Sequence, residues 1–193
     1  MHCCVLFSSP RGAESNTHAL LQVFLDTWEA HGHTAEVFSL YDLTITPCRA
    51  CRVCQRDHTE PHCAIDDDMT AIFESVLRCD LLLLATPIYS WYCTAPMKAA
   101  LDRMVYAMNK FYAGEKGPSL WRSKSVALLS SCGYRPERGS DLLEEGLQRY
   151  CRHSQLRWLG NLVERHLNYD TPFMNEEKVQ HVRTFAAELL QNL

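Results

Sequence analysis

The chain has 193 residues, of which 47% are hydrophobic and 22% charged, and this size and composition suit a single globular domain over residues 1–193. Its formal net charge of −4 and the lack of a basic cluster exclude nucleic acid and anionic membranes as expected partners. No basic, signal-like start precedes the first apolar run, and the longest aliphatic run is far too short to span a bilayer, so we expect a cytoplasmic protein.

Apolar runs typical of buried parallel strands alternate with segments in which apolar residues recur at helical spacing. The expected strands are 2–7, 34–40, 81–85, 124–130 and 157–163. The expected helices are 15–32, 69–77, 96–105, 140–153 and 175–192. Ser15 and the run Asp66 to Asp68 offer N-cap side chains, and Pro96 suits the first turn of its helix. Five alternations of strand and helix predict an α/β fold with a doubly wound parallel sheet.

Three loops follow the carboxyl ends of expected strands, where such a sheet binds its ligands. The first, Ser8 to Thr17, reads SSPRGAESNT and places hydroxyls, an amide and one cation just before a helix begins. It has neither the glycine pattern of a dinucleotide site nor the Gly-Lys-Ser/Thr of a P-loop. Free N–H groups at a helix start favour a phosphate, although plain helix capping explains the same residues equally well.

The second loop, Thr86 to Thr94, carries two tyrosines and a tryptophan directly after the central strand. Aromatic side chains at the mouth of a crevice suit a flat, conjugated ligand, whereas a single one is more often part of a core or an interface. The third loop is Ser131 to Arg138. A phosphate pocket beside a planar-ring pocket describes flavin mononucleotide (FMN).

Three motifs resemble those of the flavodoxin-fold NAD(P)H-dependent FMN reductase family, in particular its branch similar to iron–sulfur flavoproteins. They are SSPRGAESNT, then CRACRVC followed by CAIDDDM, then TPIYSWYCTAPMKAALDR. The likeness is specific from Met1 to about Met104, and beyond that only the order of strands and helices matches. It implies a flavodoxin-like five-stranded sheet of order 2-1-3-4-5 in a three-layer sandwich.

The resemblance also implies the cofactor contacts. The FMN phosphate would be bound by Ser9, Arg11, Ser15, Asn16 and Thr17. The isoalloxazine ring would be lined by Pro87, Ile88, Tyr89, Ser90, Trp91, Ser131, Cys132 and Gly133. No catalytic side chain is expected, because the hydride passes to N5 of the flavin. Lys98, Asp102 and Arg103 match the last motif and are expected to be structural.

Ten cysteines in a cytosolic chain are expected to stay reduced. Four of them form a group in the loop 48–63, namely Cys48, Cys51, Cys54 and Cys63. A Cys-x2-Cys-x2-Cys run with a distant fourth cysteine suits a [4Fe–4S] cluster. Zinc held with His58 or His62, disulfides and free or redox-active thiols are the alternatives. The other six are expected to be small buried hydrophobes, with Cys93 and Cys132 set apart because they fall in flavin loops.

These observations predict an FMN-dependent oxidoreductase that takes hydride from NAD(P)H and reduces a quinone, a flavin, an iron compound or an attached cluster. The alternative is an electron-transfer protein that uses FMN, with or without a cluster, and works with a redox-protein partner. A flavodoxin-like binding module whose thiols sense zinc or oxidation is a third hypothesis. The aromatic-rich segment from Trp91 to Tyr112 is more apolar than one flavin pocket requires, and with the resemblance it predicts a homodimer or homotetramer.

Overall fold

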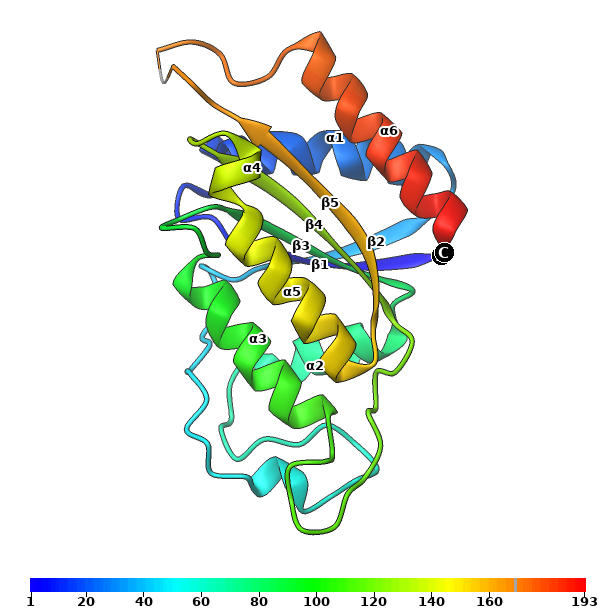
Figure 1. Ribbon diagram of the computed structural model, residues 1–193. Coiled ribbons are helices and arrows are strands. Elements are labelled where there is room, and N and C mark those ends of the chain that lie inside the picture. Colours follow the sequence, from blue (N-terminus) through cyan, green and yellow to red (C-terminus); the bar gives the residue numbers. More distant parts are fainter. Residues whose placement is uncertain (169) are drawn as a thin grey trace.

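The computed structural model describes residues 1–168 and 170–193, and its five strands form one parallel sheet in the order β2-β1-β3-β4-β5 (Figure 1). The strands are β1 (His2–Phe7), β2 (Thr34–Ser39), β3 (Leu81–Pro87), β4 (Ser125–Cys132) and β5 (Arg157–Arg165). The helices are α1 (Asn16–Ala30), α2 (Met69–Arg78), α3 (Ala95–Met108), α4 (Pro136–Gly139), α5 (Asp141–Ser154) and α6 (Glu176–Asn192), with short 3-10 helices η1 (Gly12–Glu14) and η2 (Val53–Gln55). The predicted strand order is confirmed.

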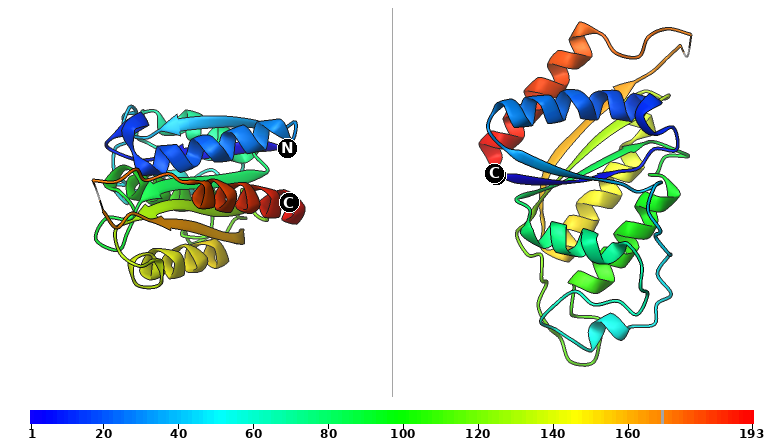
Figure 2. Two further views of the ribbon diagram at one scale, coloured as in Figure 1. Left: turned by 90° about the horizontal axis from the view of Figure 1, so that it is seen from above. Right: turned by 180° about the vertical axis from the view of Figure 1, so that it is seen from behind.

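Helices cover both faces of the sheet, so the molecule has three layers (Figure 2). Helices α1 and α6 lie on one face, and α2, α3 and α5 lie on the other. Successive residues of a strand point to opposite faces. Val5 and Leu83 therefore pack in the core under α1 and α6, whereas Leu6 and Leu84 pack in the core under α2, α3 and α5.

The register of the strands brings the ends of β1, β3 and β4 to one edge of the sheet. Phe7 pairs with Ala85, and Pro87 pairs with Ser131. The loops that follow these strands therefore leave side by side. The same edge receives the end of β5, where Cys132 pairs with Arg165.

Three predicted strands end later in the structure than their sequence patterns indicated, and the one expected at 124–130 ends at Cys132. The strand expected at 81–85 continues through Thr86 and Pro87, because Ile88 supplies the next N–H and donates it to the Ser131 carbonyl at 2.9 Å. The strand expected at 157–163 continues to Arg165, where it still pairs with β4. Of the run Asp66 to Asp68 expected to cap α2, Asp67 accepts the Met69 N–H, at 3.3 Å.

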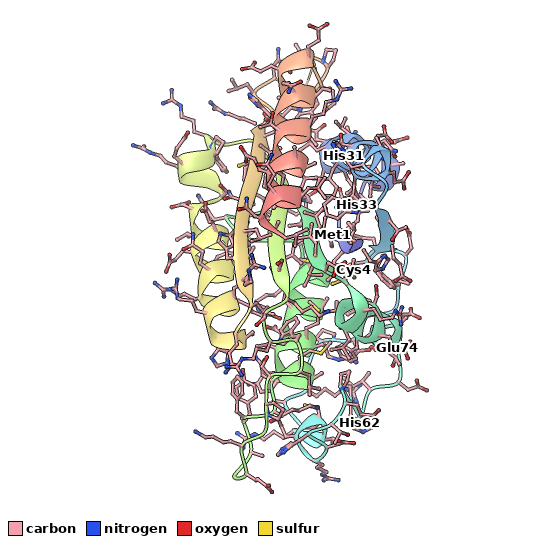
Figure 3. All side chains as sticks on the ribbon, turned by 90° about the vertical axis from the view of Figure 1, so that its right-hand side faces the viewer. Met1, Cys4, His31, His33, His62 and Glu74 are labelled. Carbon is pink, nitrogen blue, oxygen red and sulfur yellow. The ribbon has the colours of Figure 1, made fainter. Side chains whose placement is uncertain are left out.

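The cysteine segment 48–63 lies at the end of the molecule away from α6, where His62 is labelled in Figure 3. There η2 lies beside the chain that leaves α3, held by contacts described below. Within the described parts of the chain, no helix has the length and apolar character needed to cross a membrane.

Candidate functional site

A cavity of about 140 Å³ opens at the carboxyl edge of the sheet, where the predicted loops converge. Its lining consists of Ser9, Arg11, Ser15, Asn16, Thr17, Pro87, Ile88, Tyr89, Ser131, Cys132, Gly133 and His166. Eleven of the thirteen residues that the sequence proposed for FMN are in this lining. Ser90 and Trp91 are not among them, and His166 is an addition.

The start of α1 forms the polar end of the cavity. Ser15 caps the helix by accepting the His18 N–H at 3.1 Å, and its hydroxyl donates to the Gly12 carbonyl at 2.7 Å. Arg11 is exposed and forms no ion pair with any other described residue. A free guanidinium beside the amino end of a 15-residue helix is an environment that attracts an anion.

Buried hydroxyl groups fix the three loops to one another below the cavity. The Thr17 and Ser131 hydroxyls lie 2.8 Å apart and join the first loop to the third. The Ser8 and Thr94 hydroxyls lie 2.5 Å apart and join the first loop to the second. These contacts between residues remote in sequence hold the lining in place before any ligand binds.

His166, just after β5, is the lining residue that the sequence analysis missed. Its Nδ1 accepts a hydrogen bond from the Asn16 amide at 3.0 Å, and its Nε2 donates to the Thr171 carbonyl at 3.0 Å. Its backbone N–H donates to the Cys132 carbonyl at 2.9 Å. The rule that strand ends carry function would have indicated His166 if the loop after the fifth strand had been counted with the other three.

Trp91 lies outside the cavity because of the turn that carries it. Tyr89 and Tyr92 exchange two backbone hydrogen bonds, of 2.8 and 3.0 Å, across Ser90 and Trp91. Both central residues have left-handed φ values, 50° and 68°, as a type I′ turn requires. The turn directs the Trp91 ring onto Tyr134, with centroids 5.7 Å apart and planes 11° from parallel.

The Trp91 Nε1 also donates to the Arg138 carbonyl at 3.0 Å. The tryptophan thus connects the loop after β3 to the loop after β4. Non-glycine residues in left-handed turns are strained and concentrate at functional sites, which agrees with the place of this turn at the mouth of the cavity.

The lining offers little acid–base chemistry. None of the described residues around the cavity is a carboxylate. Burial raises the pKa of the Cys132 thiol, which stays neutral at physiological pH and is a weak nucleophile in that form. A cavity of this composition can bind and orient a ligand.

All four cysteines of the segment 48–63 line a second, smaller cavity of about 20 Å³, next to Arg103 and Tyr106. Cys54 is buried, Cys48 and Cys63 are half-buried, and Cys51 is exposed. Burial raises the pKa of Cys54 and outweighs the lowering effects of the Gln55 hydrogen bond and the Lys110 charge. In the described parts of the chain, no three His, Cys, Asp or Glu side chains stand close enough together to hold a single metal ion.

Two buried cations lie beside these cysteines. Arg103 forms a two-point ion pair with Asp67, at 2.8 Å from Nη1 and 3.0 Å from Nη2, and only 1% of its side chain is exposed. Its Nε is buried and has no hydrogen-bond partner. Lys110 is fully buried, and its ammonium donates to the Cys54 carbonyl at 2.7 Å.

Gln55 fixes this segment to the end of α3. Its side-chain amide donates to the carbonyls of Tyr106 and Asn109, at 2.7 and 2.9 Å, and its Oε1 accepts the Tyr112 N–H at 3.0 Å. Of the charged residues in the last motif, Arg103 is buried in the ion pair with Asp67 described above. Lys98 and Asp102 form an exposed pair one helical turn apart.

Residues 1–152 match the family model described as NADPH-dependent FMN reductase. An iron–sulfur flavoprotein from Methanosarcina thermophila is 31% identical over 105 residues, which cover 54% of this chain and 53% of that protein. FMN-dependent NADH:quinone oxidoreductase 2 from Pseudomonas fluorescens is 27% identical over 140 residues, which cover 67% and 69%. The chain spans about half the length of the iron–sulfur flavoproteins that it matches.

Two solved structures show the same architecture. An NAD(P)H:quinone oxidoreductase from Methanothermobacter marburgensis aligns with a TM-score of 0.73 at 20% identity, over 98% of this chain and 97% of that one. An FMN-dependent NADH-azoreductase from Bacillus anthracis aligns with a TM-score of 0.71 at 11% identity, over 100% of this chain and 99% of that one. At these identities the alignments establish the flavodoxin-like fold.

Proposed function

The chain belongs to the NADPH-dependent FMN reductase family, and on that premise we propose that the cavity lined by Arg11, Asn16 and Tyr89 binds FMN and that the protein is an NAD(P)H-dependent oxidoreductase. The observation that carries the proposal is the convergence of eleven expected residues, from three separate loops, on this one cavity. A quinone is the favoured acceptor, since one relative is an FMN-dependent NADH:quinone oxidoreductase.

In this proposal the protein's own residues bind FMN and orient it. Arg11, Asn16 and the free N–H groups at the start of α1 suit the phosphate, and the loops after β3 and β4 suit the ring. When bound, FMN supplies the hydride-accepting and electron-transferring chemistry. The ten cysteines, none of them in a disulfide, are in keeping with the reducing cytoplasm that we propose as its location.

The test has two parts. FMN added to the purified protein should bind in a one-to-one ratio, and the loaded protein should oxidise NADH or NADPH in the presence of a quinone. No FMN binding would contradict the whole proposal. FMN binding with slow NAD(P)H oxidation but rapid exchange of electrons with a redox protein would instead support the electron-transfer alternative.

We further propose that the second cavity holds a [4Fe–4S] cluster on Cys48, Cys51, Cys54 and Cys63. The four thiols share one cavity with Arg49, Arg52 and Arg103, and the buried Lys110 donates to the Cys54 carbonyl beside it, so this environment suits an anionic group. Several relatives are iron–sulfur flavoproteins. When bound, the cluster adds one-electron transfer.

Iron and acid-labile sulfide should be measured on protein prepared without oxygen, beside a Cys51→Ser variant. About four irons per chain, falling in the variant, would support the cluster. If iron-free protein oxidises NAD(P)H at the full rate, the four cysteines take no part in the reaction. Zinc, disulfides or free thiols would then account for them.

A further inference from the structure

Lys110 has an unusual environment for a lysine. It is fully buried, and no carboxylate in the described parts of the chain lies within ion-pair distance of its ammonium. Its hydrogen bond to the Cys54 carbonyl joins it to a neutral group. Burying a charge without a counter-ion is costly, and lysines are almost never fully buried unless they are paired.

The other charged groups around Lys110 do not neutralise it. Asp67 is occupied by Arg103, so this pair has no net charge. Burial lowers the pKa of Lys110, and the charges of Asp57 and Glu60 oppose this effect only in part. Both carboxylates are at the protein surface or close to it, and Asp57 is bound to Thr59. Arg49 and Arg52 line the small cavity and add positive charge. The net charge around the four thiols is therefore positive.

We propose that Lys110 is the built-in counter-charge of an anionic [4Fe–4S] cluster on the four cysteines, and that it raises the reduction potential of that cluster. The inference depends on the cluster proposed above. A cubane with four thiolate ligands is negatively charged, and gaining one electron makes it more so without forming or breaking a bond. A fixed positive charge in a poorly solvated environment stabilises the reduced form more than the oxidised form.

A counter-charge and a purely mechanical contact place different requirements on residue 110. The Lys110 ammonium could serve only as a clamp on the Cys54 carbonyl, in which case any donor of similar length would replace it. A counter-charge requires the positive charge itself. Arg103 is not an equivalent candidate, because Asp67 already offsets its charge.

The experiment compares the wild type with Lys110→Met, Lys110→Gln and Lys110→Arg. All are loaded with FMN and with iron and sulfide under anaerobic conditions. The midpoint potential of the cluster is then measured by a mediator titration followed by electron paramagnetic resonance, with dithionite as the source of the electron. Lys116→Met is the matched control, because Lys116 lies in the same loop and is exposed.

The Met and Gln variants should have more negative midpoint potentials than the wild type. At a fixed applied potential, the ratio of reduced to oxidised cluster should fall at least about tenfold, which corresponds to a shift of about 59 mV for one electron. The Arg variant and the Lys116→Met control should stay close to the wild type, because the first keeps the charge and the second removes a solvated one. Since the Gln variant keeps a donor, its agreement with the Met variant would exclude the clamp.

Three results would overturn the inference. If the wild-type protein binds FMN but no cluster, both this inference and the cluster proposal are wrong. If a cluster binds but its potential is unchanged in the Met and Gln variants, only this inference is wrong. If those two variants fail to fold, as judged by circular dichroism and FMN stoichiometry, an Arg variant whose potential differs from that of the wild type would overturn the inference.

Discussion

Arg11 is the residue at which the nature of the ligand can be tested most directly. Its guanidinium lies near the start of α1 and forms no ion pair with any described residue, and only FMN, not riboflavin, carries a phosphate for it to bind. A hydrogen bond to a charged group is worth about 1.5–3 kcal/mol, so Arg11→Ala should weaken FMN binding by about ten- to a hundredfold. Fluorescence titrations with FMN and with riboflavin should show the loss for FMN only.

Arg183→Ala, which removes an exposed arginine on α6, provides the control and should leave both affinities unchanged. Equal weakening of both ligands by Arg11→Ala would remove Arg11 from the phosphate site.

His166 is expected to act through Asn16. Its Nδ1 accepts the Asn16 amide hydrogen, which fixes the orientation of that side chain in the cavity. His166→Ala should therefore weaken FMN binding by about three- to tenfold, in line with the net 0.5–1.5 kcal/mol of one hydrogen bond. Calorimetric titration measures the change. If the affinity falls as much in a background of Asn16→Ala, the two residues act independently and the coupling is absent.

The cavity residues differ in how far the sequence could predict them. Most of them lie in three contiguous segments, which follow β1, β3 and β4. Once the end of each strand was predicted, all the cavity residues of the segment after it could be predicted too. Trp91 could not be placed in this way. Its ring direction depends on two left-handed φ values and on Tyr134, more than forty residues away. His166 follows directly after a strand whose end the apolar pattern placed too early.

At the scale of the elements, one buried ion pair, Arg103 with Asp67, holds the segment between β2 and α2 in place. The Asp67 carboxylate accepts hydrogen bonds from Nη1 and Nη2 of Arg103, which lies on α3. It also accepts the Thr46 N–H, at 2.9 Å. Arg103 in turn donates to the Thr46 carbonyl, at 2.8 Å. Both side chains are almost completely buried. This pair fixes the segment before and after the cysteines to the helix against which they pack.

Removing one partner of a buried pair leaves an uncompensated charge, at a cost of about 3–5 kcal/mol. We therefore expect Asp67→Asn to lower the free energy of unfolding by about that amount, measured by urea denaturation. Asp102→Asn, which breaks the exposed pair with Lys98, should change it by about 1 kcal/mol or less.

The same pair predicts a dependence on pH. Burial by itself raises the pKa of Asp67, but the hydrogen bonds from Arg103, Thr46 and Met69 outweigh it and hold the pKa below its usual value. A carboxyl whose pKa is lowered by folding stabilises the protein above its unfolded pKa of about 3.9, and that contribution is lost as the pH falls through the folded value. The wild type should lose stability below about pH 4 more steeply than Asp67→Asn does.

Element order was predictable and element ends were not, for a physical reason. Buried parallel strands are continuous apolar runs, so Leu81 to Ala85 was visible in the sequence. Thr86 and Pro87 look like a strand end, yet they remain paired because the neighbouring strand supplies partners that sequence periodicity does not reveal. For the same reason nothing in the sequence showed that Lys110 would be buried against Cys54.

At the scale of the whole molecule, the two cores share one sheet, and we expect residues 1–193 to unfold as one domain. The surface beside the first cavity is unusually apolar. We define an aromatic face by its members Tyr89, Trp91, Tyr92, Tyr134 and Leu142, which are 48%, 43%, 53%, 56% and 48% exposed. Tyr92 and Leu142 also line an apolar groove between α3 and α5. Clustered exposed side chains of this kind commonly mark an interface.

The last prediction is that a second copy of the chain covers the aromatic face, in a homodimer or homotetramer. Covering this face would bury apolar area and shield the mouth of the FMN cavity from water. Light scattering at micromolar concentration should report a mass of two or four chains. Tyr92→Glu together with Tyr134→Glu should lower the measured mass to that of one chain, because two charges would be buried without partners.

Val37→Glu, on the edge strand β2, is the control and should not change the mass, since Val37 is 44% exposed away from this face. A wild type that stays a monomer with FMN bound would leave the aromatic face open to the electron acceptor instead.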